Sequence, residues 1–248
     1  MLNYTISGAG TAVLFLHGFL ESSTMWRRLA LEDFEFRCVC VDLPGHGNSD
    51  LGFFSPPPSL DNFAQKIIDL VDHLELDHYH VVGHSMGGYV ALLLKEMDQR
   101  CKKVVLLNSN FWTDHDQKKR DRIRMADLAF NAREHLIREA IPGLFWNLTA
   151  KDTAVQELLH EALMIDPESI AFASLAMMNR EDKRHLLEEF PNDFLMIHGK
   201  HDPIIQQDIL EEQLKSLNIR VEYLDWSGHM AHVEESHLVQ SVLREFLF

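Results

Sequence analysis

The chain has 248 residues, of which 46% are apolar and 25% are charged, and its formal net charge at pH 7 is −15. This length and composition suit one globular domain with a large core and room for an inserted subdomain, and they exclude global disorder. The acidic balance argues against nucleic acid and anionic membranes as partners.

The N-terminal residues Met1 to Thr5 contain neither a basic region nor an apolar signal core, and no apolar run is long enough to span a bilayer. We therefore expect a cytoplasmic protein without a membrane partner. The cysteines agree, because Cys38 and Cys40 lie two residues apart on one predicted strand and are poorly placed for a disulfide. Buried free thiols are expected.

Short, continuous apolar runs recur along the chain, as is typical of strands buried on both faces of a parallel sheet. Residues at helical spacing lie between several of these runs, and strands that alternate with helices predict a doubly wound, mostly parallel α/β sheet. The predicted strands are 3–7, 11–16, 37–41, 79–82, 103–107, 193–198 and 220–224, and the predicted helices of the core are 60–74, 88–97, 211–217 and 237–246.

One long stretch, 111–189, has helical patterns and no convincing strand. An all-helical insertion between two strands predicts a cap, so that residues 1–110 and 190–248 form the core. Methionines in this stretch, among them Met125 and Met178, would suit an adaptable apolar pocket. The plainer interpretation is that they pack the cap onto the core.

Ser85 lies at the centre of Gly83-His84-Ser85-Met86-Gly87, a G-x-S-x-G match. An apolar run typical of a strand precedes this segment, and one typical of a helix follows it. Strand, sharp turn and helix form the context of a nucleophile elbow, in which glycines flank the serine because the turn is too tight for larger side chains. Ser85 is therefore the predicted nucleophile.

A serine hydroxyl is a weak nucleophile until a base takes its proton, and an acid must orient that base. Both partners are expected at the carboxyl ends of later strands, where α/β folds place their ligands. Asp202 follows the sixth predicted strand and His229 follows the seventh. We predict that Ser85, Asp202 and His229 form a catalytic triad. His232 competes as the base, but His229 directly follows a Ser-Gly turn.

The segment His17-Gly18-Phe19 follows the second predicted strand, where an oxyanion loop would lie. The backbone N–H groups of Phe19 and Met86 are the predicted oxyanion donors, each contributing about 3 kcal/mol to lowering the barrier. His17 is also a candidate for the substrate pocket, together with Met125, Met178 and Arg124. Structural hydrogen bonding around the site is the plainer interpretation of His17.

Together, the H-G-F, D-L-P-G-H-G-N-S-D, G-H-S-M-G-G, G-K-H-D and S-G-H motifs resemble the α/β-hydrolase superfamily along nearly the whole chain. The resemblance implies the α/β-hydrolase fold and its triad without specifying a substrate. Segment 178–182 is similar to a group that includes esterases and 3-oxoadipate enol-lactonases. Some members place the acid after the strand that here ends near Leu107. Residues 108–110 are uncharged, so Asp114 is the alternative acid that could reach back.

The nucleophile determines the class of chemistry. Haloalkane dehalogenases and epoxide hydrolases of this superfamily carry an aspartate at the elbow, so Ser85 disfavours both and implies acyl transfer through a covalent ester. We therefore expect a serine hydrolase that cleaves a small, largely apolar carboxylic ester or lactone through an acyl-enzyme. Neither a metal nor another cofactor is expected.

Two other classes of function stay open. The first is C–C bond hydrolysis, or a pyruvate-eliminating synthase step like that of menaquinone biosynthesis, in which cap arginines such as Arg122, Arg124 and Arg180 would bind substrate carboxylates. The second is a non-catalytic ligand-binding relative, although such proteins often lose members of the triad. The sequence leaves the exact substrate and the oligomeric state open.

Overall fold

The structure, a computed structural model, describes residues 1–149 and 152–247. A seven-stranded sheet runs through the molecule in the order β1-β3-β2-β4-β5-β6-β7. Every neighbouring pair is parallel except β1 with β3, which confirms the predicted mostly parallel α/β sheet. The strands are β1 (Tyr4–Ser7), β2 (Ala12–Leu16), β3 (Arg37–Val41), β4 (Tyr79–His84), β5 (Cys101–Leu107), β6 (Phe194–Gly199) and β7 (Arg220–Leu224).

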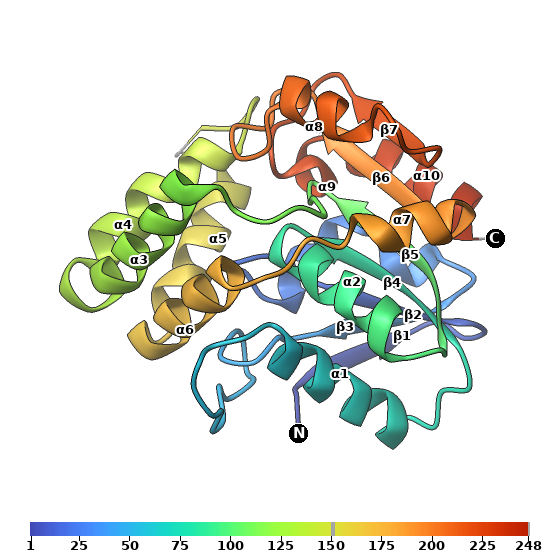
Figure 1. Cartoon of the computed structure of the whole chain (residues 1–248), viewed down its shortest axis with the longest axis horizontal. Coiled ribbons are helices and arrows are strands. Elements are labelled where there is room, and N and C mark those ends of the chain that lie inside the picture. The colour runs from blue at the N-terminus through green and yellow to red at the C-terminus, as the bar shows by residue number, and fades with distance from the viewer. Residues whose placement is uncertain (150–151, 248) are drawn as a thin grey trace.

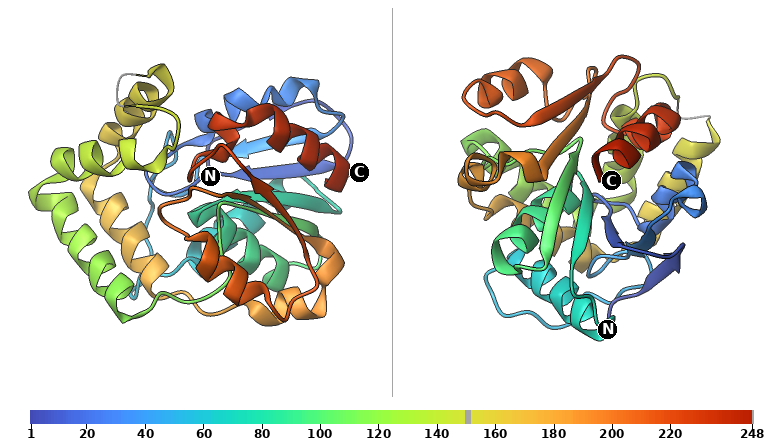
Figure 2. Two further views of the ribbon diagram at one scale, coloured as in Figure 1. Left: turned by 90° about the horizontal axis from the view of Figure 1, so that it is seen from above. Right: turned by 90° about the vertical axis from the view of Figure 1, so that its right-hand side faces the viewer.

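Helices cover both faces of the sheet (Figures 1 and 2). Alternate strand residues serve the two faces, because successive side chains of a strand point to opposite sides. Leu14 therefore belongs to the apolar cluster under α1 and α2, and its neighbour Val13 belongs to the cluster under η1 and α10. The first face carries α1 (Asp61–His73), α2 (Met86–Met97), α7 (Arg184–Glu189) and α8 (Gln207–Leu214), and the second carries η1 (Ser23–Leu29), α9 (Ala231–Glu234) and α10 (Ser236–Leu247). The short turns η2 (Leu31–Asp33) and η4 (Pro191–Asp193) lead into β3 and β6.

The chain between β5 and β6 forms a separate helical layer, the cap, which lies beside one end of the sheet (Figure 1). It has an apolar cluster of its own, into which Leu20 and Met230 of the core also pack. Within the predicted cap range 111–189, α7 packs against the core, since Leu186 and Leu187 belong to the cluster under α2. The cap elements are α3 (Asp116–Asn131), α4 (Arg133–Ala140), η3 (Pro142–Leu144), α5 (Thr153–Met164) and α6 (Pro167–Met178).

The segments that enter and leave the cap are bound to each other. The Arg180 guanidinium donates from Nε to the carbonyl of Trp112 over 3.1 Å and lies 2.8 Å from Oδ1 of Asp114. The other oxygen of Asp114 accepts from Arg122 on α3 over 3.0 Å. Asp114 therefore links the segments that enter and leave the cap, and two arginines bind its carboxylate.

The sequence also predicted buried free thiols and no membrane-spanning segment. Cys38, Cys40 and Cys101 are free and buried, and burial raises the pKa of each thiol to about 12, which makes them unreactive. Among the described residues, no helix is long and apolar enough to cross a membrane.

Candidate active site

Ser85 lies between β4 and α2 with φ 48° and ψ −113°, a backbone conformation that non-glycine residues rarely adopt. The residues two positions before and two positions after it must be glycine. A Cβ atom on Gly83 would lie 2.4 Å from the carbonyl oxygen of Gly87, and one on Gly87 would lie 2.2 Å from that of Leu16. The strand therefore passes directly into the helix, with Ser85 at the apex, as an elbow requires.

Asp202 follows β6 and is buried, and four donors face its carboxylate. Its Oδ2 atom lies 2.8 Å from Nδ1 of His229, and its Oδ1 atom accepts from the N–H groups of Ile204 and Ile205 over 2.8 and 3.0 Å. Burial alone would raise the pKa of Asp202, but the charge and hydrogen bond of His229 outweigh it and lower the pKa to about 2. The carboxylate is therefore ionised at neutral pH.

The fourth donor is Asn108, which the sequence analysis did not include in the site. Its Nδ2 atom donates to Oδ2 of Asp202 over 2.9 Å and to the carbonyl of Gly228 over 3.0 Å. Asn108 follows β5 and has φ 43°, a conformation that asparagine tolerates better than most residues. Some members of the superfamily place the catalytic acid after this strand. In this chain the Asn108 amide instead holds Asp202 and the turn before His229 together.

His229 lies directly after Gly228, at the end of the loop that follows β7. Its backbone N–H donates to the carbonyl of Leu144 in the cap over 2.8 Å. Its ring centroid lies 5.0 Å from that of His84, the residue before Ser85, which places it beside the elbow. His232 is also buried, but neither of its ring nitrogens has a hydrogen-bond partner within the described part of the chain. His229, and not His232, contacts Asp202.

The two predicted oxyanion donors are free of backbone acceptors. Neither the N–H of Phe19 nor that of Met86 donates to a backbone carbonyl within residues 1–149 and 152–247. Met86 is the first residue of α2, so its N–H points out of the helix end without an intrahelical partner. Because Met86 is fully buried, its N–H is a donor shielded from solvent beside Ser85.

His17 is the first residue of the predicted oxyanion loop. The N–H of Leu43 donates to its Nε2 atom over 2.9 Å, so the proton of the neutral ring is on Nδ1, which donates to the carbonyl of Gly18 over 2.7 Å. In a trans peptide the carbonyl of Gly18 and the N–H of Phe19 point in opposite directions. His17 therefore turns the Phe19 N–H away from itself, and both of its ring nitrogens are already engaged.

The other predicted pocket residues lie on the cap. Met125 on α3 and Met178 at the end of α6 are half-buried, while Arg124 is exposed. Arg122 and Arg180 are the cap arginines bound to Asp114. The structure thus brings Ser85, Asp202, His229, Phe19 and Met86 to the carboxyl ends of neighbouring strands, while Arg124 is exposed on α3.

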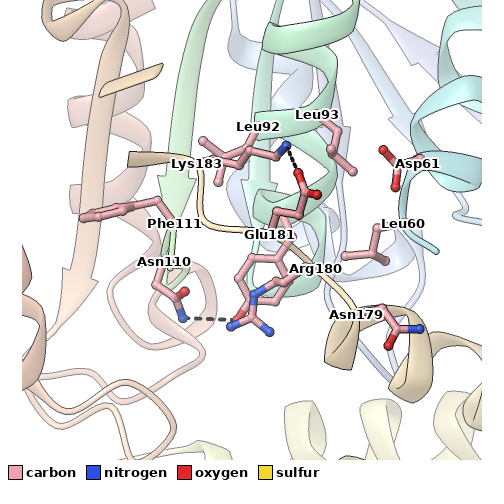
Figure 3. Close-up of a pocket in the computed structure, with 11 residues that line it drawn as sticks. Leu60, Asp61, Leu92, Leu93, Asn110, Phe111, Asn179, Arg180, Glu181 and Lys183 are labelled. Carbon is pink, nitrogen blue, oxygen red and sulfur yellow. Dashed lines mark hydrogen bonds and ion pairs between the residues drawn. The ribbon is translucent and has the colours of Figure 1, made fainter. Parts of the chain in front are cut away.

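A pocket of about 130 Å³ opens between α1, α2 and segment 179–183 (Figure 3). Its lining includes Tyr89 and Asn110, which are joined by a hydrogen bond of 3.2 Å between Nδ2 and the phenol oxygen, and it also includes Arg180. None of the three triad residues lines it. The pocket of Figure 3 is therefore separate from the predicted triad.

A family model described as the alpha/beta hydrolase fold matches residues 11–236. The chain belongs to the α/β-hydrolase family. Among solved structures, this α/β hydrolase is similar to a thermophilic esterase from Thermogutta terrifontis with malate bound, at 27% identity and a TM-score of 0.88, over 99% of this chain and 92% of that one. It is also similar in fold to the enol-lactonase from Burkholderia xenovorans LB400, at 22% identity and a TM-score of 0.85, over 99% of this chain and 96% of that one.

Similar curated proteins have other activities. The chain is 36% identical over 91 residues to a fluoroacetate dehalogenase from Burkholderia sp, across 35% of this chain and 30% of the relative. It is 26% identical over 245 residues to the dihydrolipoyllysine-residue acetyltransferase component of an acetoin cleaving system from Pseudomonas putida, across 96% of this chain and 64% of the relative. The chain therefore spans between 30% and 64% of the length of these relatives.

Proposed function

We propose that this α/β hydrolase is a serine hydrolase that cleaves a small, largely apolar carboxylic ester or lactone through an acyl-enzyme. The observation that carries the proposal is the ionised Asp202, bound to Nδ1 of His229 over 2.8 Å beside the strained Ser85 elbow. The likeness to the Thermogutta esterase supports the same class of substrate.

In this mechanism, Nε2 of His229 takes the proton of the Ser85 hydroxyl as Oγ attacks the carbonyl carbon of the substrate. The oxyanion of the tetrahedral intermediate accepts hydrogen bonds from the N–H groups of Phe19 and Met86. His229 then gives its proton to the leaving alkoxide. A water molecule, deprotonated by the same histidine, attacks the acyl ester, and collapse of the second intermediate releases the acid and restores Ser85.

The surroundings of the elbow favour an apolar acyl group. Leu20, Phe145, Leu158 and Met230 belong to the apolar cluster between cap and core, and Leu20 and Met230 are the immediate neighbours of Phe19 and His229. Met230, which follows the proposed base, is almost fully buried there. Apolar side chains at this position would stabilise a bound acyl chain by removing its surface from water.

The alternative activities would use cap arginines, and two of those named for that role are already paired with a carboxylate. A carboxylate substrate for C–C cleavage or pyruvate elimination would be held by free cap arginines, but Asp114 engages both Arg122 and Arg180. Arg124, the third cap arginine named for that role, is exposed. We therefore place ester or lactone hydrolysis first.

The test is turnover of p-nitrophenyl esters from acetate to laurate by the wild type and by Ser85→Ala. Ser216→Ala is the matched control, because this exposed serine contacts Arg184 and precedes β7, at the opposite end of that strand from His229. Turnover that peaks at short or medium chains and disappears only in Ser85→Ala would support the proposal. Labelling of Ser85 by a fluorophosphonate without any ester turnover would instead indicate an active serine with another substrate class.

A further inference from the structure

Glu21 and His84 form a buried ion pair that the mechanism above does not use. Glu21 lies two residues after Phe19, and His84 immediately precedes Ser85. Their side chains are 2% and 0% exposed, and Oε2 of Glu21 lies 3.0 Å from Nδ1 of His84. The pair therefore lies directly beneath the predicted oxyanion loop and the elbow.

Each partner of the pair also holds the backbone of a catalytic segment. The same Oε2 atom of Glu21 accepts from the N–H of Gly18 over 2.6 Å. On the other side, Nε2 of His84 lies 2.9 Å from the carbonyl oxygen of His229. A continuous path of hydrogen bonds thus runs from the oxyanion loop through Glu21 and His84 to the predicted base.

This arrangement requires a charged His84. Both of its partners are acceptors, a carboxylate and a carbonyl, so the ring can make both hydrogen bonds only with a proton on each nitrogen. Burial alone would lower the pKa of His84, but the charge and hydrogen bond of Glu21 outweigh it and raise the pKa. Burial would raise the pKa of Glu21, and the charge and hydrogen bond of His84 lower it to about 2.

The other titratable groups around the pair do not replace either partner. His232 packs against His84 with a ring-centroid distance of 4.8 Å, and burial followed by the charge of His84 keeps the pKa of His232 well below its usual value. His17 is neutral and bound to Leu43 and Gly18, while Asp202 is bound to His229. Glu21 is thus the anion in contact with His84.

Gly18 provides independent evidence that the loop is packed onto this pair. A Cβ atom on Gly18 would lie 2.8 Å from Oε2 of Glu21 and 2.8 Å from Nδ1 of His84. A residue with a side chain at this position would therefore push the two partners apart. The loop therefore packs so closely onto the ion pair at Gly18 that only glycine fits there.

We propose that Glu21 is a positioning residue which, through His84, holds the oxyanion loop and the His229 turn in one fixed geometry. Glu21 acts through these groups and does not touch the substrate. The proposal rests on the proposed function only for its effect on turnover. With glutamine at position 21, His84 would be neutral, and its Nδ1 atom could only accept from the amide NH₂ group while Nε2 donates to His229. The atom in the Oε2 position would then be a donor and could no longer accept from the N–H of Gly18, so the oxyanion loop would lose its hold.

The first test is Glu21→Gln, which keeps the size of the side chain and removes its charge. We expect kcat to fall by about 10- to 100-fold, less than the 10²- to 10³-fold lost when an oxyanion donor is removed outright, with KM changed by less than about threefold. Asp98→Asn is the matched control, because Asp98 is a buried acid paired with Arg100 at the opposite end of β5. This control should lower the unfolding temperature and leave kcat of the folded enzyme unchanged.

A second variant and a second readout keep the test decisive if Glu21→Gln does not fold. In His84→Asn the amide Nδ2 can take the place of ring Nδ1 and keep the bond to Glu21, while the bond to the His229 carbonyl is lost. We expect the same fall in kcat. Independently, ¹⁵N spectra of labelled histidines at pH 7 should show His84 protonated on both nitrogens in the wild type and on one in Glu21→Gln.

The spectra and the rate of Ser85 labelling by a fluorophosphonate need no ester, so failure of this proposal can be distinguished from failure of the proposed esterase activity. A neutral His84 in the wild type would overturn the proposal. So would folded Glu21→Gln or His84→Asn proteins whose labelling rates remain within twofold of the wild type, because a merely structural pair would lower stability alone.

Discussion

Replacement of Asp202 by Asn should place the wrong ring nitrogen of His229 toward the nucleophile. The Oδ1 position of residue 202 faces two fixed backbone N–H donors, from Ile204 and Ile205. The Oδ2 position faces the side-chain amide of Asn108, which can turn over to present its oxygen, so we expect the amide oxygen of Asn to occupy the Oδ1 position. The NH₂ group then occupies the Oδ2 position, 2.8 Å from Nδ1 of His229. Nδ1 must accept, the ring proton moves to Nε2, and His229 can no longer take a proton from Ser85.

The same change in a Ser-His-Asp triad lowers turnover by about 10⁴-fold, so we expect kcat/KM of Asp202→Asn to fall by about 10⁴, equivalent to about 5 kcal/mol of transition-state stabilisation. The assay is p-nitrophenyl ester hydrolysis at a temperature at which circular dichroism shows both proteins folded. Asp114→Asn is the comparison, since Asp114 is the alternative acid and here binds two arginines. Asp202 is not the orienting acid if Asp202→Asn keeps more than a tenth of wild-type kcat/KM, or if Asp114→Asn loses more activity than Asp202→Asn does.

Three shorter predictions follow from other parts of the structure. Gly87→Ala would place a Cβ atom 2.2 Å from the carbonyl oxygen of Leu16, so urea denaturation should show a loss of about 3 kcal/mol or more; a loss below about 1 kcal/mol would contradict the elbow geometry. Glu234→Ala removes the carboxylate that accepts from the N–H of Gly228 over 2.8 Å, and it should lower kcat by several-fold because the His229 turn is released, whereas unchanged kcat would show that the turn holds itself. His46 is buried, and chiefly through that burial its pKa is lowered from 6.5 to about 3. Because only the unfolded chain binds a proton at this group between about pH 6 and pH 4, the free energy of unfolding should fall there by up to about 1.4 kcal/mol per pH unit. A flatter pH profile of unfolding free energy in the wild type than in His46→Gln would refute this.

Most strands could be predicted from the sequence because β2 to β6 are short, largely apolar runs that are mostly buried, whereas β1 and β7 are only partly buried. Arg37–Val41 and Arg220–Leu224 have the predicted bounds. The elbow differs slightly, since β4 continues to His84 and α2 begins at Met86, with Ser85 alone between them. The turn was predicted longer because strain at a single residue leaves no mark in the composition.

The site residues that were missed act through contacts across large sequence separations. Asn108 reaches Asp202 across 94 residues and Glu21 reaches His84 across 63. A polar residue after a buried strand hints at Asn108, but no local pattern marks Glu21, whose role depends on a charge on His84. For the same reason the sequence could not show that Arg124 is exposed, since helical spacing on α3 does not reveal which face is covered.

The contact between the cap and His229, the proposed base, affects how caps can be exchanged among α/β hydrolases. The carbonyl of Leu144 accepts from the His229 N–H, and the N–H groups of Trp146 and Asn147 donate to Glu234 of the core over 2.7 and 2.6 Å. Segment 144–147 therefore holds the turn that carries His229, although it belongs to the inserted cap. A chimera that grafts a foreign cap onto this core should retain that segment with the core, so that engineers can change the acyl pocket without dismantling the acid–base pair beneath it.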